Sequence, residues 1–207
     1  MRSPEFDLTF NRPVRTVITE RTIMTGDVRL TTTFTTTFNP DGSIAERAVT
    51  EGGRTTRRAY TPPDSADRTV LNLAGSSVEV DGVHLGGPGV ETAVIYRDGG
   101  AVQRIELHHE QTDTPIVATY TRHSEHRVET TAIHLQGMLL QEETITTDAD
   151  GRVVEVITRP SEPGQESVER YRYLDNTEGD WVVAHCEVFV AGHVVSRGMW
   201  RRTLEYR

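Results

Sequence analysis

The sequence predicts an all-β protein whose antiparallel strands follow one another as a meander, with little helix. Alternation of apolar and polar residues with a period of two is the recurring pattern of the 207-residue chain, and no stretch keeps an apolar period of 3.6 residues for three turns. Turns that contain glycine separate the alternating stretches, as at Asn39-Pro40-Asp41-Gly42 and Asp148-Ala149-Asp150-Gly151. Because glycine adopts the positive φ that tight hairpins need, each of these turns predicts a hairpin.

The composition favours strands that have one face in water. The chain contains 29 threonines, and threonine suits a half-exposed strand because its methyl group packs while its hydroxyl contacts water. Only 35% of the residues are hydrophobic, but the polar excess lies in threonine and arginine rather than in the Pro, Ser and Lys that are typical of disordered chains. We therefore expect a folded protein, and its length is enough to bury a substantial core.

The clearest strand runs over residues 27–38. Its alternation assigns one set of side chains to the buried face: Val28, Leu30, Thr32, Phe34, Thr36 and Phe38. The same pattern predicts about 13 to 15 strands, arranged as a large twisted sheet or as an open or closed barrel. The expected strand ranges are 14–24, 27–38, 43–50, 54–60, 69–73, 77–80, 90–97, 101–109, 116–122, 127–135, 138–147, 152–158, 166–174, 181–190 and 194–206.

Two interruptions subdivide the chain. Proline and glycine break the alternation at residues 61–67 and 86–89. They leave N-terminal hairpins at 14–60, a connecting segment at 61–89 and a C-terminal meander at 90–207. Because the connecting segment is too short to bury a core of its own, we expect one all-β domain over residues 1–207.

The charge of the chain argues against nucleic acid as a partner. The net charge is -9 and the pI is near 5.4, whereas binding to phosphates requires a concentrated basic face. All 22 basic residues are arginine, which indicates a GC-rich, bacterial coding sequence. For the densest groups we expect solvated ion pairs across strands, since alternation divides them between the two faces of a sheet: Arg54, Arg57, Arg58, Arg201 and Arg202.

The sequence also gives an expected location. A single cysteine, Cys186, cannot form an internal disulfide, and no apolar run approaches the roughly 18 residues of a membrane span. Residues 1–10 lack the apolar centre of a signal peptide. We expect a cytoplasmic protein if Met1 is the natural start, or a secreted protein if a signal peptide was removed. Residues 1–6 could be the remnant of a cloning site.

Several turn segments resemble the YD repeats of Rhs-type proteins, in which an aromatic residue precedes Asp, a short gap, Gly and an apolar strand. The matching segments are Tyr171-Arg172-Tyr173-Leu174-Asp175 with Gly179-Asp180-Trp181, Phe38-Asn39-Pro40-Asp41-Gly42-Ser43-Ile44, Tyr96-Arg97-Asp98-Gly99-Gly100-Ala101-Val102 and Thr147-Asp148-Ala149-Asp150-Gly151-Arg152-Val153. The resemblance covers about a quarter of the chain, and the spacing between the glycines is irregular. It implies a β-meander that serves as a scaffold or shell, and it assigns no functional residue.

Cys186 is a candidate nucleophile, because His185 and His193 lie near it in the sequence. Alternation within residues 181–190 places Cys186 on a wholly apolar face and His185 on the opposite face. We therefore expect Cys186 to be a buried apolar residue in a central strand.

Histidines and glutamates form the other candidate groups. The histidines follow no known metal-binding spacing, so we expect no metal and no cofactor: His108, His109, His123, His126 and His134. The glutamates could supply acid and base groups of the glycosidase kind, but we expect them to face arginine across strands: Glu106, Glu129, Glu142, Glu143 and Glu155.

These observations favour a non-catalytic binding or scaffold protein that presents a threonine- and arginine-rich surface to a macromolecular partner such as another protein. The alternative is an antiparallel barrel that binds a small apolar ligand, with an enzyme acting on that ligand as a variant of this hypothesis. Under the alternative, the expected lining consists of aromatic side chains: Phe34, Phe38, Tyr96, Tyr120, Trp181 and Trp200.

Overall fold

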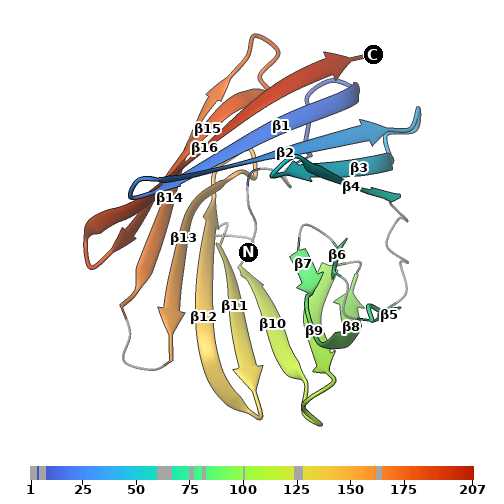
Figure 1. Ribbon diagram of the computed structural model, residues 1–207, viewed down its shortest axis with the longest axis vertical. Helices are drawn as coiled ribbons and strands as arrows, with labels where there is room; N and C mark the ends of the chain where they lie inside the picture. The colour runs from blue at the N-terminus through green and yellow to red at the C-terminus, as the bar shows by residue number, and fades with distance from the viewer. Residues whose placement is uncertain are drawn as a thin grey trace. The chain divides into compact units, whose positions relative to one another are not determined.

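The computed structural model confirms the all-β prediction (Figure 1). It describes residue 4 and residues 8–59, 67–74, 77–80, 83–99, 101–123, 128–161 and 165–207, and these contain no α-helix. The strands are β1 (Val14–Thr25), β2 (Val28–Phe38), β3 (Ile44–Glu51), β4 (Arg54–Ala59), β5 (Arg68–Asn72), β6 (Ser77–Val80), β7 (Val83–Gly86), β8 (Val90–Asp98), β9 (Ala101–His109), β10 (Ile116–His123), β11 (Val128–Leu135), β12 (Met138–Thr147), β13 (Val153–Pro160), β14 (Ser167–Asp175), β15 (Trp181–Val190) and β16 (His193–Tyr206).

Fourteen of these strands form one antiparallel meander. Their order is β4-β3-β2-β1-β16-β15-β14-β13-β12-β11-β10-β9-β8-β5, and the sheet is not closed, since β4 and β5 stand at its two ends. Strands β6 and β7 pair with each other as a separate hairpin. The predicted strand ranges include β6 but lack β7.

The turns follow the prediction where they can be compared. Gly42 and Gly151 have φ of 89° and 79°, in the region that glycine tolerates best. Two short gaps between predicted strands contain Gln136-Gly137 and Ala191-Gly192, and in each pair both residues have positive φ, as a two-residue hairpin turn requires. Residues 61–66 of the predicted interruption at 61–67 lie outside the described residues, as do Asp81, Gly82 and residues 124–126.

The described chain divides into two compact units. Unit 1 comprises residues 63–168, and unit 2 comprises residues 3–62 and 169–207. The expected single domain stays a prediction.

The core of unit 1 lies on one face of β8 and β9. Ile95 stands opposite Ile105, and Ala93 opposite Leu107, so one face of the strand pair is aliphatic. The β6–β7 hairpin contributes Leu85 to this core, where it is almost fully buried. The cluster of buried residues is Leu73, Leu85, Val90, Ala93, Ile95, Val102 and Ile105. Unit 1 therefore has a dry aliphatic core under the hairpin.

Unit 2 has one buried and one exposed face. On the buried face, Phe34 of β2 stands opposite Thr19 of β1, which stands opposite Arg202 of β16, and all three side chains are buried. The adjacent residues on the same strands, Thr33, Glu20 and Arg201, point to the other face and are more exposed. The prediction for β2 is confirmed in its central part, where Thr32, Phe34 and Thr36 are buried.

Two expectations for unit 2 are wrong. Val28 and Leu30 share the predicted buried face but are 59% and 58% exposed, because they lie near the end of the β1–β2 hairpin. Arg202 is buried rather than solvated. The expected exposed pairing does hold for Arg57, whose guanidinium lies 3.6 Å from the Glu46 carboxylate on the neighbouring strand.

Candidate functional site

The six aromatic residues expected to line a ligand site are divided between the two units. Tyr96 and Tyr120 lie in unit 1, but on opposite faces of the sheet. Tyr120 packs against the aliphatic core, whereas Tyr96 points away from it and donates a 3.2 Å hydrogen bond to Glu106. The structure therefore does not bring these two tyrosines to one surface.

The other four aromatic residues, Phe34, Phe38, Trp181 and Trp200, lie in unit 2 and pack against nearby groups of the same unit. The ring of Trp200 lies over Gly198: a methyl group at Gly198 would come within 2.7 Å of two of its ring carbons. Its centroid is 5.8 Å from that of Tyr171. Phe38 makes an edge contact with Phe10, with ring centroids 5.7 Å apart. These contacts are those of a packed core.

Arginine side chains lie against the aromatic rings on the buried face of unit 2. The Arg202 guanidinium carbon is 3.5 Å from the centroid of the Trp181 ring, and its Nη2 donates a 2.9 Å hydrogen bond to the Pro4 carbonyl. Phe34 has Arg21 on one side at 5.3 Å and Arg47 on the other at 5.5 Å. Planar guanidinium groups stack on aromatic faces, so these arginines stabilise the core. Alternation alone could not reveal this role, because the partners come from other strands.

Cys186 is buried, as predicted. Its strand, β15, lies between β14 and β16 inside the sheet, while His185 is exposed. Burial raises the pKa of the Cys186 thiol to about 12, and the Glu169 carboxylate adds to this effect. A thiol that stays protonated at neutral pH is a poor nucleophile, so the geometry does not support thiol chemistry.

The glutamates are held mainly by neighbouring polar groups. Glu129 forms a 2.8 Å ion pair with Arg122 across β10 and β11, and Glu142 lies 3.9 Å from Arg159 across β12 and β13. Both contacts confirm the expected pairing. Glu143 differs, since it is buried and accepts a hydrogen bond from Gln141 on its own strand.

The candidate histidines do not gather into one group among the residues that the structure describes. Within them, no three His, Cys, Asp or Glu side chains lie close enough to hold a metal ion. The side chain of His123 and all of His126 lie outside the described part of the chain. The same residues include no helix that is long and apolar enough to cross a membrane.

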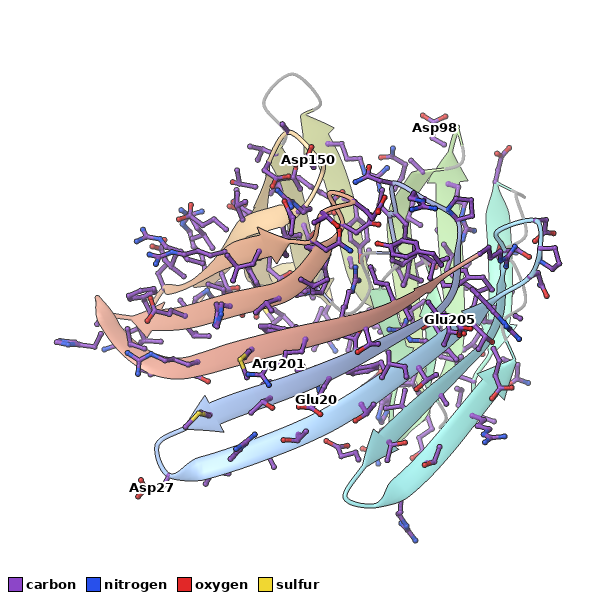
Figure 2. The ribbon with its side chains drawn as sticks, turned by 90° about the horizontal axis from the view of Figure 1, so that it is seen from above. Glu20, Asp27, Asp98, Asp150, Arg201 and Glu205 are labelled. Carbon is purple, nitrogen blue, oxygen red and sulfur yellow. The ribbon has the colours of Figure 1, made fainter. Side chains whose placement is uncertain are left out.

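The exposed face of unit 2 carries the threonine-rich surface that the sequence predicts. One row of side chains crosses five neighbouring strands in register, with Thr55, Thr50, Thr33, Glu20 and Arg201 in adjacent positions. Thr50 and Thr55 share a 2.9 Å hydrogen bond between their hydroxyls. Figure 2 shows Glu20 and Arg201 next to each other on β1 and β16.

More threonines extend this surface along β2. Thr31, Thr33, Thr35 and Thr37 all point to the exposed side, because residues two apart share a face. We define the threonine face as eleven outward side chains of β1, β2, β3, β4 and β16 in unit 2: Thr16, Ile18, Glu20, Thr31, Thr33, Thr35, Thr37, Thr50, Thr55, Arg201 and Thr203. Thr22, Glu46, Ala48, Arg57 and Glu205 lie on the same side of these strands. The threonine face is the candidate functional surface.

Sequence reasoning missed a polar network at the end of β14. The Asp180 carboxylate is buried and accepts hydrogen bonds of 2.7 Å from the Asn11 backbone amide and from the Tyr206 hydroxyl. Asn176 donates a 2.8 Å hydrogen bond to the same hydroxyl. The Asn-x-x-Gly-Asp pattern at 176–180 predicts a turn, but its partners lie far away in the sequence.

Comparison with known proteins gives a likeness of fold. No protein-family model matches the chain, and no curated protein sequence matches it. A porin-like protein from Bacteroides uniformis superposes with a TM-score of 0.55 at 12% identity, over 93% of this chain and 97% of that one. A LolA superfamily protein from Nitrosomonas europaea matches with a TM-score of 0.26 at 10% identity, over 98% and 90% of the two chains.

A DUF1329 family protein from Desulfovibrio piger matches with a TM-score of 0.23 at 12% identity, over 98% of this chain and 88% of that one. Scores this low carry no argument, and the match to the porin-like protein concerns the fold alone. None of these comparisons tests the resemblance to YD repeats, which stays a prediction. The chain is thus similar in fold, at low identity, to a porin-like protein.

Proposed function

We propose that this protein is a non-catalytic binding protein that docks another protein on the threonine face of unit 2. The observation that carries the proposal is the row Thr55, Thr50, Thr33, Glu20 and Arg201, which crosses five strands in register. None of its side chains is buried. To a partner, the row presents hydroxyl groups at its β4 end. At its β16 end it presents one negative and one positive charge.

The physical reason is preorganisation. Threonine has a single branched side-chain torsion that a strand already restricts, so it loses little conformational freedom when a partner covers it. Glu20 and Arg201 stand opposite each other on β1 and β16, and neighbouring opposite charges favour partners with the complementary arrangement. A polypeptide partner can supply both the hydrogen-bonding groups and the charges.

The two core regions support a binding role in preference to chemistry at the buried faces. The Cys186 thiol is buried and its pKa is raised. The aromatic side chains expected to line a ligand site contact other core groups: Trp200 lies against Gly198 and Tyr171. The threonine face is available to a partner without any rearrangement of these cores.

Site-specific photo-cross-linking tests the proposal. A photoreactive phenylalanine analogue replaces Thr33 on the threonine face, or Thr121 as a matched control: Thr121 is an exposed threonine on β10 of unit 1. In an extract of the source organism we expect one dominant protein adduct at position 33 and none at position 121. Equal adducts at both positions, or no adduct at position 33, contradict the proposal.

A charge reversal tests the specificity of the same surface. Arg201→Glu places two carboxylates opposite each other on β1 and β16, so we expect the adduct at position 33 to fall at least about tenfold. The reciprocal variant, Glu20→Arg with Arg201→Glu, restores the attraction between the two strands and serves as the control for folding. An adduct at position 33 that survives Arg201→Glu at full yield would show that the two charges do not select the partner.

A further inference from the structure

Strand β4 of unit 2 is an end strand of the large sheet, so one of its edges has no neighbouring strand in the described part of the chain. Figure 1 shows β4 beyond β3. Its residues, Arg54–Ala59, pair with β3 in continuous register. Neither a bulge nor a proline interrupts the strand, although natural sheets commonly use such interruptions to block further pairing. The open edge of β4 is therefore regular enough to pair with a further strand.

The turn between β3 and β4 fixes the direction of the backbone groups. Gly52 and Gly53 both have positive φ, at 56° and 78°, and they connect the opposed residues Glu51 and Arg54. In a two-residue hairpin of this kind, the residues that flank the turn exchange backbone hydrogen bonds. The backbone N–H and C=O groups of Arg54 thus face β3.

The open edge presents the backbone of Thr55 and Arg57. Hydrogen-bonded and non-hydrogen-bonded residue pairs alternate along an antiparallel ladder, so Thr56 faces β3 as Arg54 does. The N–H and C=O groups of Thr55 and Arg57 then point away from β3. Both side chains are exposed as well. Donors and acceptors that repeat every second residue match the backbone of another strand, so this edge selects an extended polypeptide.

The charge of this hairpin differs from that of the whole chain. Residues 44–59 contain four arginines and two glutamates, whereas the net charge of the chain is -9. Strand β4 itself carries three arginines and no acid. Arg57 lies 3.6 Å from the Glu46 carboxylate, but the two side chains are 75% and 47% exposed, so water weakens this contact. Because opposite charges on neighbouring strands attract, an incoming strand that carries carboxylates is favoured.

A second copy of the chain is a poor match for the same edge. If two β4 strands paired, each would bring three arginines and no acid to the contact. Like charges on neighbouring strands repel, and charged side chains at an edge oppose such self-pairing. The arginines therefore protect the open edge against its own copy while they attract an acidic strand.

We propose that the open edge of β4 binds an extended acidic peptide, which adds to the sheet as one more strand. The peptide backbone pairs with the outward groups of Thr55 and Arg57, and its carboxylates lie beside the β4 arginines. The inference goes beyond the threonine face, since it concerns a strand edge. Arg201 lies on β16, four strands away, so Arg201→Glu, which tests that face, changes peptide binding less than about twofold.

Titration with synthetic peptides tests the proposal on the full chain. The probe is a fluorescent peptide of alternating threonine and glutamate, and its control has glutamine in place of glutamate. We expect the glutamate peptide to bind at least about threefold more tightly in about 50 mM salt, and this preference to shrink in about 500 mM salt. When the peptide is bound, amide hydrogen exchange measured by NMR should slow at least about tenfold at Thr55 and Arg57.

Proline on the open edge blocks the backbone pairing. Thr55→Pro removes an N–H that points away from β3, which an edge strand tolerates, and we expect the affinity for the glutamate peptide to fall at least about tenfold. Val70→Pro on β5, the other end strand, is the matched control. The Leu73 amide donates to the Glu91 carbonyl of β8, so alternation directs the Val70 N–H away from β8. Val70→Pro should leave peptide binding unchanged.

A second variant keeps the backbone and removes one charge. Arg57→Gln should lower the affinity for the glutamate peptide about threefold and leave that for the glutamine peptide unchanged. Circular dichroism establishes that each variant is folded. The proposal is overturned if the glutamate peptide does not bind, if both peptides bind equally, or if exchange at Thr55 and Arg57 does not slow. Slower exchange at these amides at high protein concentration without peptide assigns the edge to a second copy and also overturns it.

Discussion

The Tyr206 hydroxyl donates a 2.7 Å hydrogen bond to the Asp180 carboxylate, which joins the last strand of the chain, β16, to the turn before β15. The other oxygen of this carboxylate accepts the Asn11 backbone amide. Partial burial raises the pKa of the Tyr206 hydroxyl, and the hydrogen bond to Asp180 acts in the same direction. One buried carboxylate thus fixes three separate parts of unit 2.

Removal of this carboxylate should destabilise unit 2. We expect Asp180→Ala to lower the free energy of unfolding by about 2–3 kcal/mol, because it removes the buried carboxylate that accepts hydrogen bonds from the Asn11 amide and the Tyr206 hydroxyl. Tyr206→Phe removes the hydrogen bond to Asp180 and the one from Asn176, and it should lower the free energy of unfolding by about 1–2 kcal/mol. Urea unfolding of both single variants and the double variant measures the coupling. Strictly additive effects would show that the two residues act independently.

Arg202 and Arg201 are adjacent but should respond differently to substitution by lysine. Arg202→Lys replaces the planar group that stacks on Trp181 and bonds to the Pro4 carbonyl, so we expect a loss of about 1–3 kcal/mol of stability. Arg201→Lys changes an exposed side chain and should alter stability by less than about 0.5 kcal/mol. Thermal unfolding of the two variants compares them directly. A loss of equal size in both would contradict the burial of Arg202.

Position 198 requires a glycine because of the nearby Trp200 ring, not because of the backbone conformation of Gly198. In Gly198→Ala, the new methyl group would lie 2.6 Å from Cη2 and 2.7 Å from Cζ3 of Trp200, so the ring must move at a cost of about 1–3 kcal/mol. Tryptophan fluorescence should shift as the ring leaves its site. In a Trp200→Leu background, Gly198→Ala should lower the free energy of unfolding much less. An unchanged cost in that background would mean that the strain arises elsewhere.

The Cys186 thiol should be inert and should make stability depend on pH in alkaline solution. Its pKa is about 12 in the folded protein and about 9 ordinarily. The unfolded thiol therefore ionises first, so its stabilising contribution is complete below pH 9 and is lost as the pH rises from 9 to 12. The stability difference between the natural sequence and Cys186→Ala, measured in urea at several pH values, should narrow over this window.

Reaction with a disulfide reagent gives an independent check of the same thiol. At pH 8 we expect Cys186 to react slowly in the native protein and rapidly in urea, because burial limits both access and ionisation. Fast reaction in the native state would contradict the buried position of β15 in the sheet.

Alternation predicts the face of a side chain but not what covers that face. It correctly separates Phe34 from Thr33 on β2 and Arg202 from Arg201 on β16. It fails at Val28 and Leu30, which are exposed because the core ends before the strand does. The alternation of residues within one strand does not show where the core ends. It also could not choose Arg202 as the buried arginine, since its ring partner Trp181 belongs to a different strand.

The pairing of β1 with β16 is the other feature that local patterns could not predict. Neighbours in the sequence form hairpins, and short connections predict those pairs. The register of Val17 with Leu204 joins strands from opposite ends of the chain, and nothing in either stretch identifies its partner. The threonine face was predictable as a composition, but its row across five strands depends on this long-range pair.

Because β1 and β16 are neighbours while β4 and β5 are not, the chain is a circular permutation of a simple serial meander. The Arg207 amide donates a 3.1 Å hydrogen bond to the Pro13 carbonyl, so a short linker can join Arg207 to Pro13. New termini between β4 and β5 would then place every strand of the large sheet beside its neighbours along the polypeptide. A gene with this order of strands should encode a protein that folds faster. The reason is that β1 and β16, which pair in the middle of the sheet, would then be neighbours in the sequence.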